Sequence, residues 1–418
     1  MIRRNITSNL LAALADTPVV LLNGARQTGK STLAKAIASR EYPAKYITLD
    51  DFSPLSAARH DPVGFLAGLD GPVIIDEVQK APNLFPAIKA VVDRDRQPGR
   101  FLLTGSANVF LLPRLSESLA GRMEILTLWP FSQGEIAGIR EAFIDTLFDK
   151  KIPARVPDPE NQARILGRLM IGGYPEPFLR TSSARRNAWF ESYVTTLLHR
   201  DVRDLANIEG LANLPRILSI LAIRVPNFLN FAELSRTAAI PQSTLKRYLT
   251  LLEAVFLVQN IPAWSGNLGK RLVKASKVVI SDTGLKAHLT GTRAERMVAD
   301  GSIGGYLENF VIMELRKQIA WSRIRPKMFH FRTQTGQEVD IVLEDPTGRL
   351  AGIEVKSASM VGPEDFRGLR ALAEAAGRSF HRGIVLYMGT EIVPFGQNLH
   401  AVPVPALWNW GGFRDVVS

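Results

Sequence analysis

One segment near the start of the chain has the residue types and spacing of a phosphate-binding loop. Residues 24 to 31, GARQTGKS, fit the pattern G-x-x-x-x-G-K-[ST], directly after the apolar run VVLLN and before the helical pattern STLAKAIA. Gly24 and Gly29 let the backbone wrap around phosphate oxygens, which the N–H groups of a helix N-terminus attract. Lys30 is expected to reach the β and γ phosphates, and Ser31 to bind magnesium. The expected nucleotide-binding residues are Gly24, Ala25, Arg26, Gln27, Thr28, Gly29, Lys30, Ser31 and Thr32.

Polar residues end two further apolar runs. Asp76 and Glu77 follow PVII, so Asp76 is expected to hold magnesium through water and Glu77 to act as the general base. On its own, such a pair also fits a helix cap. The next run, RFLLTGSAN, carries Thr104 and Ser106, which either sense the γ-phosphate and orient water or are ordinary turn residues. With the phosphate loop upstream, these residues predict magnesium-dependent hydrolysis of ATP.

A second group of ionisable residues lies in the last third of the chain. Asp340 in EVDIVLE and Glu354 and Lys356 in LAGIEVK lie on successive predicted strands, and Glu308 lies on the preceding predicted helix. This arrangement resembles the restriction-endonuclease-like core, in which the carboxylates hold a divalent metal ion and the lysine stabilises developing charge. Because D-x(13)-E-x-K is frequent by chance, metal-dependent cleavage stays open beside a fold kept only for DNA binding or self-association.

The elements that position these residues follow from the apolar pattern. Between residues 18 and 135, the runs PVVLLNG, AKYITLDD, GPVIIDE and RFLLTGSA alternate with helical patterns, which predicts a parallel sheet covered by helices. Residues 150–162 hold three prolines and several charges, as a linker or exposed loop does. From about residue 300, a helix GYLENFVIMELRKQIAWS precedes the strands MFHFRT, EVDIVLE and LAGIEVK, the helical DFRGLRALAEAAG and the strand RGIVLYM. The expected domains are 1–149, 163–265 and 266–418.

The middle of the chain is mostly helical, and residues 231–264 have the organisation of a winged helix-turn-helix. A first helix is expected to end near Ala239, a turn to follow, Ser243 to cap a second helix, and residues 255–261 to form a wing strand. The candidate DNA contacts, near the start of the second helix, are Gln242, Thr244, Lys246 and Arg247. The alternative is a small domain that only packs against its neighbours or another protein.

Composition narrows the classes of function. The net charge is +11, and residues 181–280 hold 13 Lys and Arg against 6 Asp and Glu, a local excess that fits nucleic-acid contact, with DNA favoured. Cysteine is absent, so we expect no disulfide or thiolate metal site, and a cytoplasmic location. The six histidines show no H-x-x-x-H or H-E-x-x-H spacing, so the sequence does not support a zinc hydrolase. No run reaches the roughly 18 apolar residues of a membrane span, and the first residues do not resemble a signal peptide.

Taken together, the motifs resemble the AAA-type ATPases fused to a DUF4143 C-terminal region. The phosphate loop, IIDE, LLTGSAN, the LAGR segment ending at Arg122 and LTLWPFSQGEI carry the ATPase part of the resemblance. GGYPEPFL at 172–179, RDV at 200–202, SDTGL at 281–285 and LEN at 307–309 extend it across essentially the whole chain. The resemblance implies an AAA-type fold, ATP hydrolysis and homo-oligomers, with Arg114 or, as favoured here, Arg122 as an arginine finger or γ-phosphate sensor. Two departures stand out: no helical-lid arginine motif is recognisable, and Val339 precedes Asp340 where nucleases often have proline.

We therefore expect an α/β protein with an AAA-type parallel sheet, a central winged-helix segment and a restriction-endonuclease-like domain. Its expected function is ATP hydrolysis coupled through domain movement to the binding or remodelling of nucleic acid. The alternative is an ATP-dependent switch that binds protein partners and carries an inactive nuclease-like domain. A metabolic kinase is a third possibility, but the sequence shows no binding site for a small-molecule phosphate acceptor.

Overall fold

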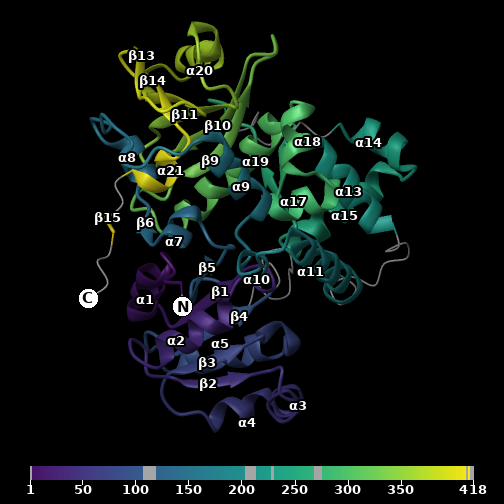
Figure 1. Ribbon diagram of the computed structural model, residues 1–418. Helices are drawn as coiled ribbons and strands as arrows, with labels where there is room; N and C mark the ends of the chain where they lie inside the picture. The colour runs from purple at the N-terminus through teal and green to yellow at the C-terminus, as the bar shows by residue number, and fades with distance from the viewer. Residues whose placement is uncertain are drawn as a thin grey trace. The chain divides into compact units, whose positions relative to one another are not determined.

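The chain forms two compact units in the computed structural model, which describes residues 2–106, 119–202, 213–226, 230–267, 275–410 and 413–414. One unit comprises residues 4–130 together with 250–257, and we refer to it as the ATPase unit. The other comprises residues 1–3, 131–249 and 258–418, and we refer to it as the C-terminal unit. Figure 1 shows the elements of both. The division into three domains, with boundaries near 150–162 and 265, stays a prediction.

The ATPase unit is built on a parallel five-stranded sheet in the order β2-β3-β4-β1-β5. The strands are β1 (Val19–Asn23), β2 (Lys45–Thr48), β3 (Val73–Asp76), β4 (Phe101–Gly105) and β5 (Met123–Thr127). The helices are α1 (Thr7–Asp16), α2 (Lys30–Ala38), α3 (Phe52–His60), α4 (Pro62–Ala67), the 3₁₀ turn η1 (Val78–Lys80) and α5 (Leu84–Arg94). The three central strands are buried throughout, because helices cover both faces of a parallel sheet. The predicted parallel sheet is confirmed.

The edge strands of this sheet differ from the central ones. β2 and β5 are only partly buried, and α3 and α4 lie beside β2 (Figure 1). β5 was not among the predicted strands, because MEILT contains Glu124 and forms no continuous apolar run. An edge strand has one neighbour and one exposed side, so its sequence carries a weaker apolar signal.

The first half of the C-terminal unit is helical, as predicted. Its helices are α7 (Gln133–Ala137), α8 (Phe143–Phe148), α9 (Gln162–Ile171), α10 (Pro175–Phe178), α11 (Ser183–Thr196), a π-helical turn (Leu197–Asp201), α13 (Leu214–Arg224), α14 (Phe231–Ala238) and the first part of α15 (Gln242–Ala254). From Thr250 on, α15 belongs to the ATPase unit. The short strands β6 (Ile139–Arg140) and β15 (Phe413–Arg414) pair with each other. Between α8 and α9, residues 149–161 contain no helix or strand, which agrees with the loop read from their prolines and charges.

The segment read as a helix-turn-helix contains two helices and a short turn. α14 ends at Ala238, and Ala239 has left-handed backbone angles. α15 begins at Gln242, so Ser243 lies inside its first turn and does not cap it from outside. The following strand, β7 (Val258–Ile261), begins later than expected, because α15 extends to Ala254. β7 pairs antiparallel with β8 (Lys277–Ile280).

The rest of the C-terminal unit is a mixed six-stranded sheet with helices. The order β13-β14-β12-β11-β10-β9 combines β9 (Lys327–Arg332), β10 (Glu338–Glu344), β11 (Leu350–Lys356), β12 (Phe380–Tyr387), β13 (Val393–Gly396) and β14 (Leu399–Pro403). The accompanying helices are α17 (Thr283–Thr290), α18 (Ala294–Ala299), α19 (Ile303–Ile319), η5 (Pro363–Phe366), α20 (Arg367–Ala376), η6 (Gly377–Ser379) and α21 (Ala406–Asn409). The four predicted strands correspond to β9 to β12. β13 and β14 were missed, since proline and glycine interrupt their pattern.

α20 packs closely against this sheet. A Cβ atom at Gly368 would lie 1.7 Å from the carbonyl oxygen of Glu338, and one at Gly352 would lie 2.7 Å from Leu369. Glycine is therefore required at Gly368, where the backbone of β10 comes close, and a side chain at Gly352 would displace the buried Leu369. The buried side chains of this layer include Phe329, Val342, Leu369, Leu372 and Val385.

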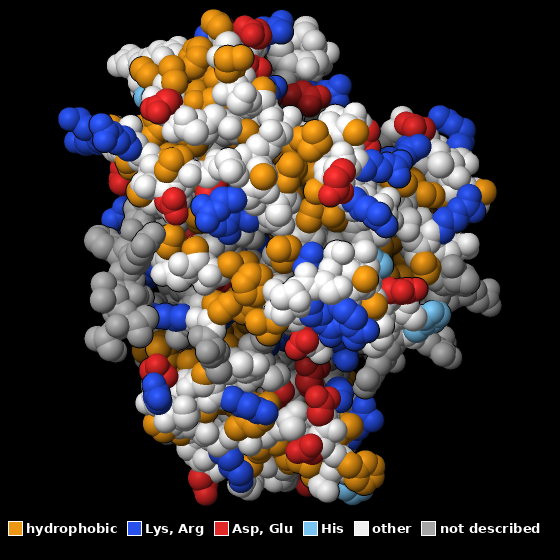
Figure 2. Space-filling view, in the orientation of Figure 1, with side chains coloured by type: hydrophobic (Ala, Val, Ile, Leu, Met, Phe, Trp, Pro, Cys, Tyr) orange, Lys and Arg blue, Asp and Glu red, His pale blue; other side chains and the backbone are white. Residues whose placement is uncertain are grey.

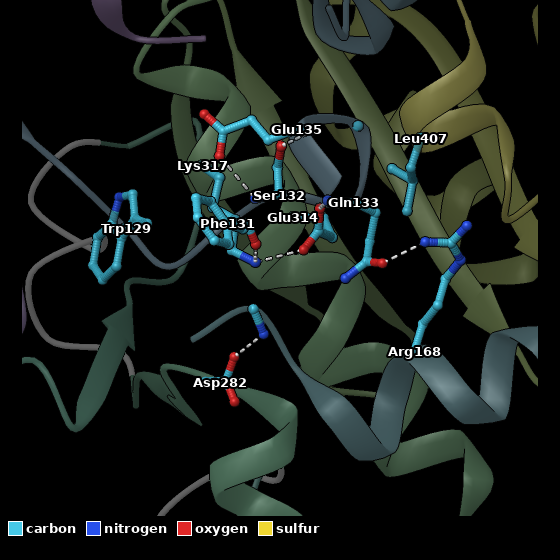
Figure 3. A network of polar contacts seen from close by, with 12 residues as sticks. Trp129, Phe131, Ser132, Gln133, Glu135, Arg168, Asp282, Glu314, Lys317 and Leu407 are labelled. Atoms are coloured by element: carbon cyan, nitrogen blue, oxygen red, sulfur yellow. Dashed lines mark hydrogen bonds and ion pairs between the residues drawn. The ribbon is translucent and has the colours of Figure 1, made fainter. Parts of the chain in front are cut away.

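Segments far apart in the sequence meet in a buried polar network of the C-terminal unit (Figure 3). The N–H of Gln133 donates to Glu314 (2.9 Å), and Lys317 Nζ donates to Glu314 (2.6 Å) and to the carbonyl of Phe131 (2.9 Å). The N–H of Gly173 donates to Asp282 (2.7 Å). The stretches PFSQGEI, GGYPEPFL and SDTGL of the family resemblance thus converge on α19.

Among the described residues, no helix combines the length and the apolar character needed to cross a bilayer.

Candidate functional site

The phosphate loop lies between β1 and α2, at the C-terminal edge of the parallel sheet. Gly24, Gln27 and Gly29 have positive φ values of 147°, 64° and 93°. A Cβ atom at Gly24 would lie 2.2 Å from the carbonyl oxygen of Leu128, the residue that follows β5. Only glycine fits there, since the loop backbone packs directly on the chain after β5. Gly29 stands at the N-cap of α2, so the helix N-terminus opens toward the loop.

Arg4, which is not part of the phosphate-loop motif, also binds the loop. Its Nη1 donates to the carbonyl of Thr28 (2.7 Å) and its Nη2 to the carbonyl of Trp129 (2.6 Å). The Thr28 hydroxyl donates to the carbonyl of Ala25 (2.9 Å). A guanidinium that bridges two backbone carbonyls fixes the loop relative to the segment after β5. No sequence signal relates Arg4 to a loop so distant along the chain.

Lys30 is buried, with 5 % of its surface exposed, although it carries a charge. Its Nζ donates to the carbonyls of Gly24 (2.9 Å) and Ala25 (2.8 Å), so the ammonium lies within the curve of the loop. This is the position from which a lysine reaches phosphate oxygens. Of the other predicted loop residues, Ala25 and Thr28 are buried, Arg26 is half-buried, and Gln27 and Thr32 are exposed.

The carboxylate of Asp76, at the end of β3, accepts hydrogen bonds from three elements. Ser31 Oγ donates to both of its oxygens at 2.9 Å, and Thr104 at the end of β4 donates to Oδ1. Tyr46 on β2 donates to Oδ2 (2.7 Å). Burial, and then the bond to Asp76, raise the pKa of Tyr46. The structure thus brings Ser31, Asp76 and Thr104 together as predicted, and adds Tyr46, which no motif indicated.

Glu77 follows β3 in a left-handed conformation, with φ at 59°. Its carboxylate accepts hydrogen bonds from Gln79 Nε2 (2.5 Å) and Ser106 Oγ (3.3 Å), and its N–H donates to Thr104 Oγ1 (3.3 Å). A bulky residue at positive φ costs energy, so the surrounding contacts hold it there. Thr104 and Ser106 therefore orient Asp76 and Glu77 respectively, and Gln79 is a positioning residue that the sequence did not reveal.

Arg122 lies away from this group. It forms an ion pair with Asp93 on α5 and donates to the carbonyl of Ala120 (3.0 Å). It precedes β5, and β5 runs parallel to β1, with Met123 opposite Val19. Because the phosphate loop follows the other end of β1, five residues of strand, roughly 16 Å, separate the two edges. Arg122 therefore does not contact the phosphate loop of its own chain. Arg114 lies outside the described residues.

The second predicted group does come together in the C-terminal unit. The antiparallel register pairs Ile341 of β10 with Ile353 of β11. Asp340 immediately precedes Ile341 and Glu354 immediately follows Ile353, so these two residues lie next to each other across the two strands. Lys356 Nζ donates to Glu354 (3.1 Å), and the N–H of Val355 donates to Asp340 (3.0 Å). Together with Glu308 on α19, we refer to Asp340, Glu354 and Lys356 as the carboxylate centre.

A fifth charged residue, Lys277 on β8, enters the carboxylate centre. Its Nζ lies 2.5 Å from Glu308 Oε1 and 3.2 Å from Asp340 Oδ1. Burial opposes its charge, but the carboxylates of Asp340 and Glu308 outweigh burial and raise the pKa of Lys277. Burial, and then the Asp340 carboxylate, raise the pKa of Glu308 and of Glu354. Nothing in the spacing D-x(13)-E-x-K indicates a lysine so far upstream.

The candidate DNA contacts lie on the first turns of α15. Gln242, Lys246 and Arg247 are exposed and Thr244 is half-buried, whereas Leu245 and Tyr248 face the core. Lys246 Nζ lies 5.6 Å from the centre of the Phe231 ring of α14. In Figure 2, Lys and Arg side chains are prominent on the surface of this helical region.

Comparison with known families divides the chain into three matched segments. Residues 16–137 match a family described as an AAA domain, residues 163–296 a domain of unknown function (DUF8612), and residues 303–407 a domain of unknown function (DUF4143). A relative from Mycobacterium tuberculosis (strain ATCC 25618 / H37Rv), Uncharacterized protein Rv2008c, is 32% identical over 420 residues, which cover 100% of this chain and 87% of the relative. An uncharacterized protein of Haemophilus influenzae is 24% identical over 259 residues, 59% of this chain and 57% of that protein.

Solved structures are similar only at a distance. The Thermotoga maritima RuvB Holliday junction branch migration motor matches with a TM-score of 0.30 and 18% identity, over 62% of this chain and 90% of that one. A signal transduction ATPase with numerous domains from Pyrococcus horikoshii has a TM-score of 0.25 and 14% identity, over 76% of this chain and 46% of its own. At these TM-scores, neither structure supports an argument about the action of this chain.

Proposed function

The chain belongs to the family of AAA-type P-loop ATPases that carry a DUF4143 region, and we propose that it hydrolyses ATP with Mg²⁺ and couples hydrolysis to nucleic acid. DNA is the favoured partner. The observation that carries the ATPase part is the meeting of Ser31 with Asp76, 2.9 Å apart, beside the buried ammonium of Lys30. A hydroxyl and a carboxylate are ligands that suit Mg²⁺.

Each residue of this site has a chemical role in the proposal. Lys30 and the N–H groups at the start of α2 bind the phosphates, while Ser31 and Asp76 hold the metal ion. Bound Mg²⁺ neutralises charge on the phosphates. Glu77 accepts the proton of the attacking water, and Gln79 and Ser106 keep its carboxylate oriented. Tyr46 and Thr104 orient the carboxylate of Asp76, as residues behind a metal ligand commonly do.

Two substitutions test the ATPase assignment. Lys30→Ala should abolish both nucleotide binding and hydrolysis, since it removes the charge that meets the phosphates. Glu77→Gln should keep nucleotide binding and lower the rate about 10²–10⁴-fold, because it removes the general base. Hydrolysis and binding of a fluorescent ATP analogue would be measured together, with circular dichroism to check folding. Hydrolysis at the unmodified rate in both folded variants would refute the site.

The nucleic-acid part of the proposal rests on two features. Exposed Lys246 and Arg247 lie in the first turns of α15, in a helix-turn-helix arrangement followed by the β7–β8 pair, which we interpret as a winged helix. The surrounding sequence has the local basic excess. Cleavage of nucleic acid is not part of the proposal.

A structural link between nucleotide and partner is also available within the chain. The segment 250–257 belongs to the ATPase unit, where the Phe256 ring meets Trp129 edge-on at 5.6 Å. Arg4 donates one hydrogen bond to the carbonyl of Trp129 and another to the carbonyl of Thr28 in the phosphate loop. At Val258 the chain continues directly into β7, in the C-terminal unit. We propose that a change in the loop reaches the C-terminal unit along this segment.

Arg122 could act as an arginine finger only at the phosphate loop of a second copy of the chain. It lies at the sheet edge opposite the phosphate loop, so an arginine-finger role requires the neighbouring subunit of a homo-oligomer. Its ion pair with Asp93 would then have to open, since that bond occupies the guanidinium. The proposal therefore includes self-association during hydrolysis.

A further inference from the structure

The lysine that enters the carboxylate centre comes from outside the sheet that carries it. Asp340, Glu354 and Lys356 are on β10 and β11 of the six-stranded sheet, and Glu308 is on α19. Lys277 is the first residue of β8, which forms a two-stranded sheet with β7. With 4 % of its side chain exposed, Lys277 is the most buried of these charged groups.

The ammonium of Lys277 lies where a cation shared by two carboxylates would lie. It is 2.5 Å from Glu308 and 3.2 Å from Asp340, and so it links the helix to the sheet. Divalent ions bind carboxylate oxygens at about 2.0–2.6 Å. A metal ion that used these same two oxygens would be pressed against the ammonium, and two positive groups so close repel each other.

Other protein donors satisfy part of the remaining carboxylate oxygens, whereas Glu354 Oε2 is buried and accepts no hydrogen bond from the described residues. The other oxygen of Asp340 accepts from the N–H of Val355, and one oxygen of Glu354 accepts from Lys356. Lys356 also lies 3.9 Å from Asp365. Within the described residues, no group of three or more His, Cys, Asp or Glu side chains is arranged to hold a metal ion. Two lysines thus offset part of the repulsion among the three carboxylates.

We propose that Lys277 is a built-in cation that takes the place of a divalent metal ion in the carboxylate centre, so that the centre is closed to metal and does not cut nucleic acid. The inference concerns Lys277 and is independent of ATP hydrolysis. The ammonium supplies one positive charge to Glu308 and Asp340 at the place where a divalent ion would otherwise supply two. Without the ammonium, the same oxygens form a vacancy for a cation, because buried carboxylates left unpaired are costly.

The first test counts bound Mn²⁺ by calorimetry and by electron paramagnetic resonance, in nucleotide-free full-length protein. All variants carry Asp76→Asn, which removes metal binding at the phosphate site. We expect no Mn²⁺ binding that depends on Asp340, so Asp340→Asn in this background should change nothing. Binding of Mn²⁺ that Asp340→Asn abolishes, while Lys277 is present, would overturn the proposal.

The second test removes the ammonium. Lys277→Met keeps most of the apolar stem, and we expect it to gain about one Mn²⁺ per chain that its parent does not bind, with loss of that ion when Asp340→Asn is added. A folded Lys277→Met chain that gains no Mn²⁺ would contradict the proposal. If this variant does not fold, the first test, which measures Mn²⁺ binding with and without Asp340→Asn while Lys277 is present, still decides whether the centre is closed to metal.

Discussion

In the proposed nucleotide site, Asp76 is the residue that joins three elements. Its carboxylate accepts hydrogen bonds from Ser31, Tyr46 and Thr104, which come from α2, β2 and β4. The parallel arrangement of the strands makes this possible, because the C-terminal ends of β2, β3 and β4 meet at one edge of the sheet. Such partners fix the direction of a metal ligand and are commonly worth about 10–100-fold in metal affinity.

Replacing Thr104 by valine tests that role. The two side chains have the same shape, but valine can neither donate to Asp76 nor accept from the N–H of Glu77. We expect the Mg²⁺ concentration for half-maximal hydrolysis to rise about 10–100-fold. Nucleotide affinity without Mg²⁺ should stay near that of the unmodified protein. Mg²⁺ titrations of the hydrolysis rate check this, and an unchanged Mg²⁺ requirement would remove Thr104 from the site.

The residues that the sequence could predict are those that share a local motif. Gly24 to Ser31 are contiguous, and Asp76 and Glu77 end an apolar strand, so pattern and spacing were sufficient. Arg4, Tyr46, Gln79 and Lys277 were missed. They act through contacts with distant parts of the chain, as Tyr46 does with Asp76 and Lys277 with Glu308 and Asp340. Only the fold brings such pairs together.

Among the elements, α15 carries the proposed contact with nucleic acid. Its first two turns expose Gln242, Lys246 and Arg247, while Leu245, Tyr248 and Leu252 anchor it in the core. This alternation gives the helix one buried face and one charged face. A helix that meets phosphates with that face should bind in a salt-dependent way.

The double substitution Lys246→Ala with Arg247→Ala should reduce this salt dependence. Each phosphate contact that is lost lowers the slope of log K against log[salt] by about 0.9 for duplex DNA. We therefore expect a decrease of about 1–2 in the slope, measured by fluorescence anisotropy with labelled DNA. Arg185→Ala on α11, an exposed position outside α15, serves as the matched control. An equal effect of the control, or an unchanged slope in the double variant, would contradict a specific role of α15.

α7 is held by a buried carboxyl group. Glu141 accepts hydrogen bonds from Ser132 Oγ (2.8 Å) and from the N–H of Gly134 (2.8 Å). A Cβ atom at Gly134 would lie 2.3 Å from this side chain, so glycine makes the contact possible. Burial, and after it the carboxylates of Glu314 and Glu135, raise the pKa of Glu141 well above its usual value.

This raised pKa predicts how α7 responds to pH. The folded state holds a proton on Glu141 over a pH range in which the unfolded state has lost it, so local stability falls as pH rises above about 4.5. Hydrogen exchange of residues 132–141, corrected for intrinsic rates, should show a lower opening free energy at about pH 8 than at about pH 5. Glu141→Gln, which cannot ionise, should flatten this change. The same pH dependence in both proteins would argue against Glu141 as its source.

Among the strands, those with a clear apolar pattern could be predicted from the sequence. The central strands β1, β3 and β4 and the strands β9 to β12 were found because they form continuous or alternating apolar runs. β5, β13 and β14 were missed, since they lie at or near sheet edges and contain charge, proline or glycine. The start of β7 was placed early, because Val255 to Leu257 look like strand residues yet follow α15 in a turn with Phe256 at a φ of 61°.

At the scale of the whole molecule, the chain passes between its two units several times. It leaves the ATPase unit after Pro130, returns for residues 250–257 and then continues into β7. Composition alone could not predict that eight residues from the second half of the chain belong to the ATPase unit. At these crossings the chain connects the ATPase unit covalently to α15 and to the C-terminal unit, which contains β8 with Lys277. In our proposal, a change caused by ATP hydrolysis passes along this connection.

The rate of magnesium-dependent ATP hydrolysis by the full-length protein, with and without single-stranded, duplex and branched DNA, tests the central claim most directly. We predict that at least one of these forms raises the rate, that the increase weakens as salt concentration rises, and that Lys30→Ala abolishes it. A rate that stays the same with all three would contradict coupling to DNA. It would favour an ATP-dependent switch that binds protein partners, with the basic surface only in contact with solvent.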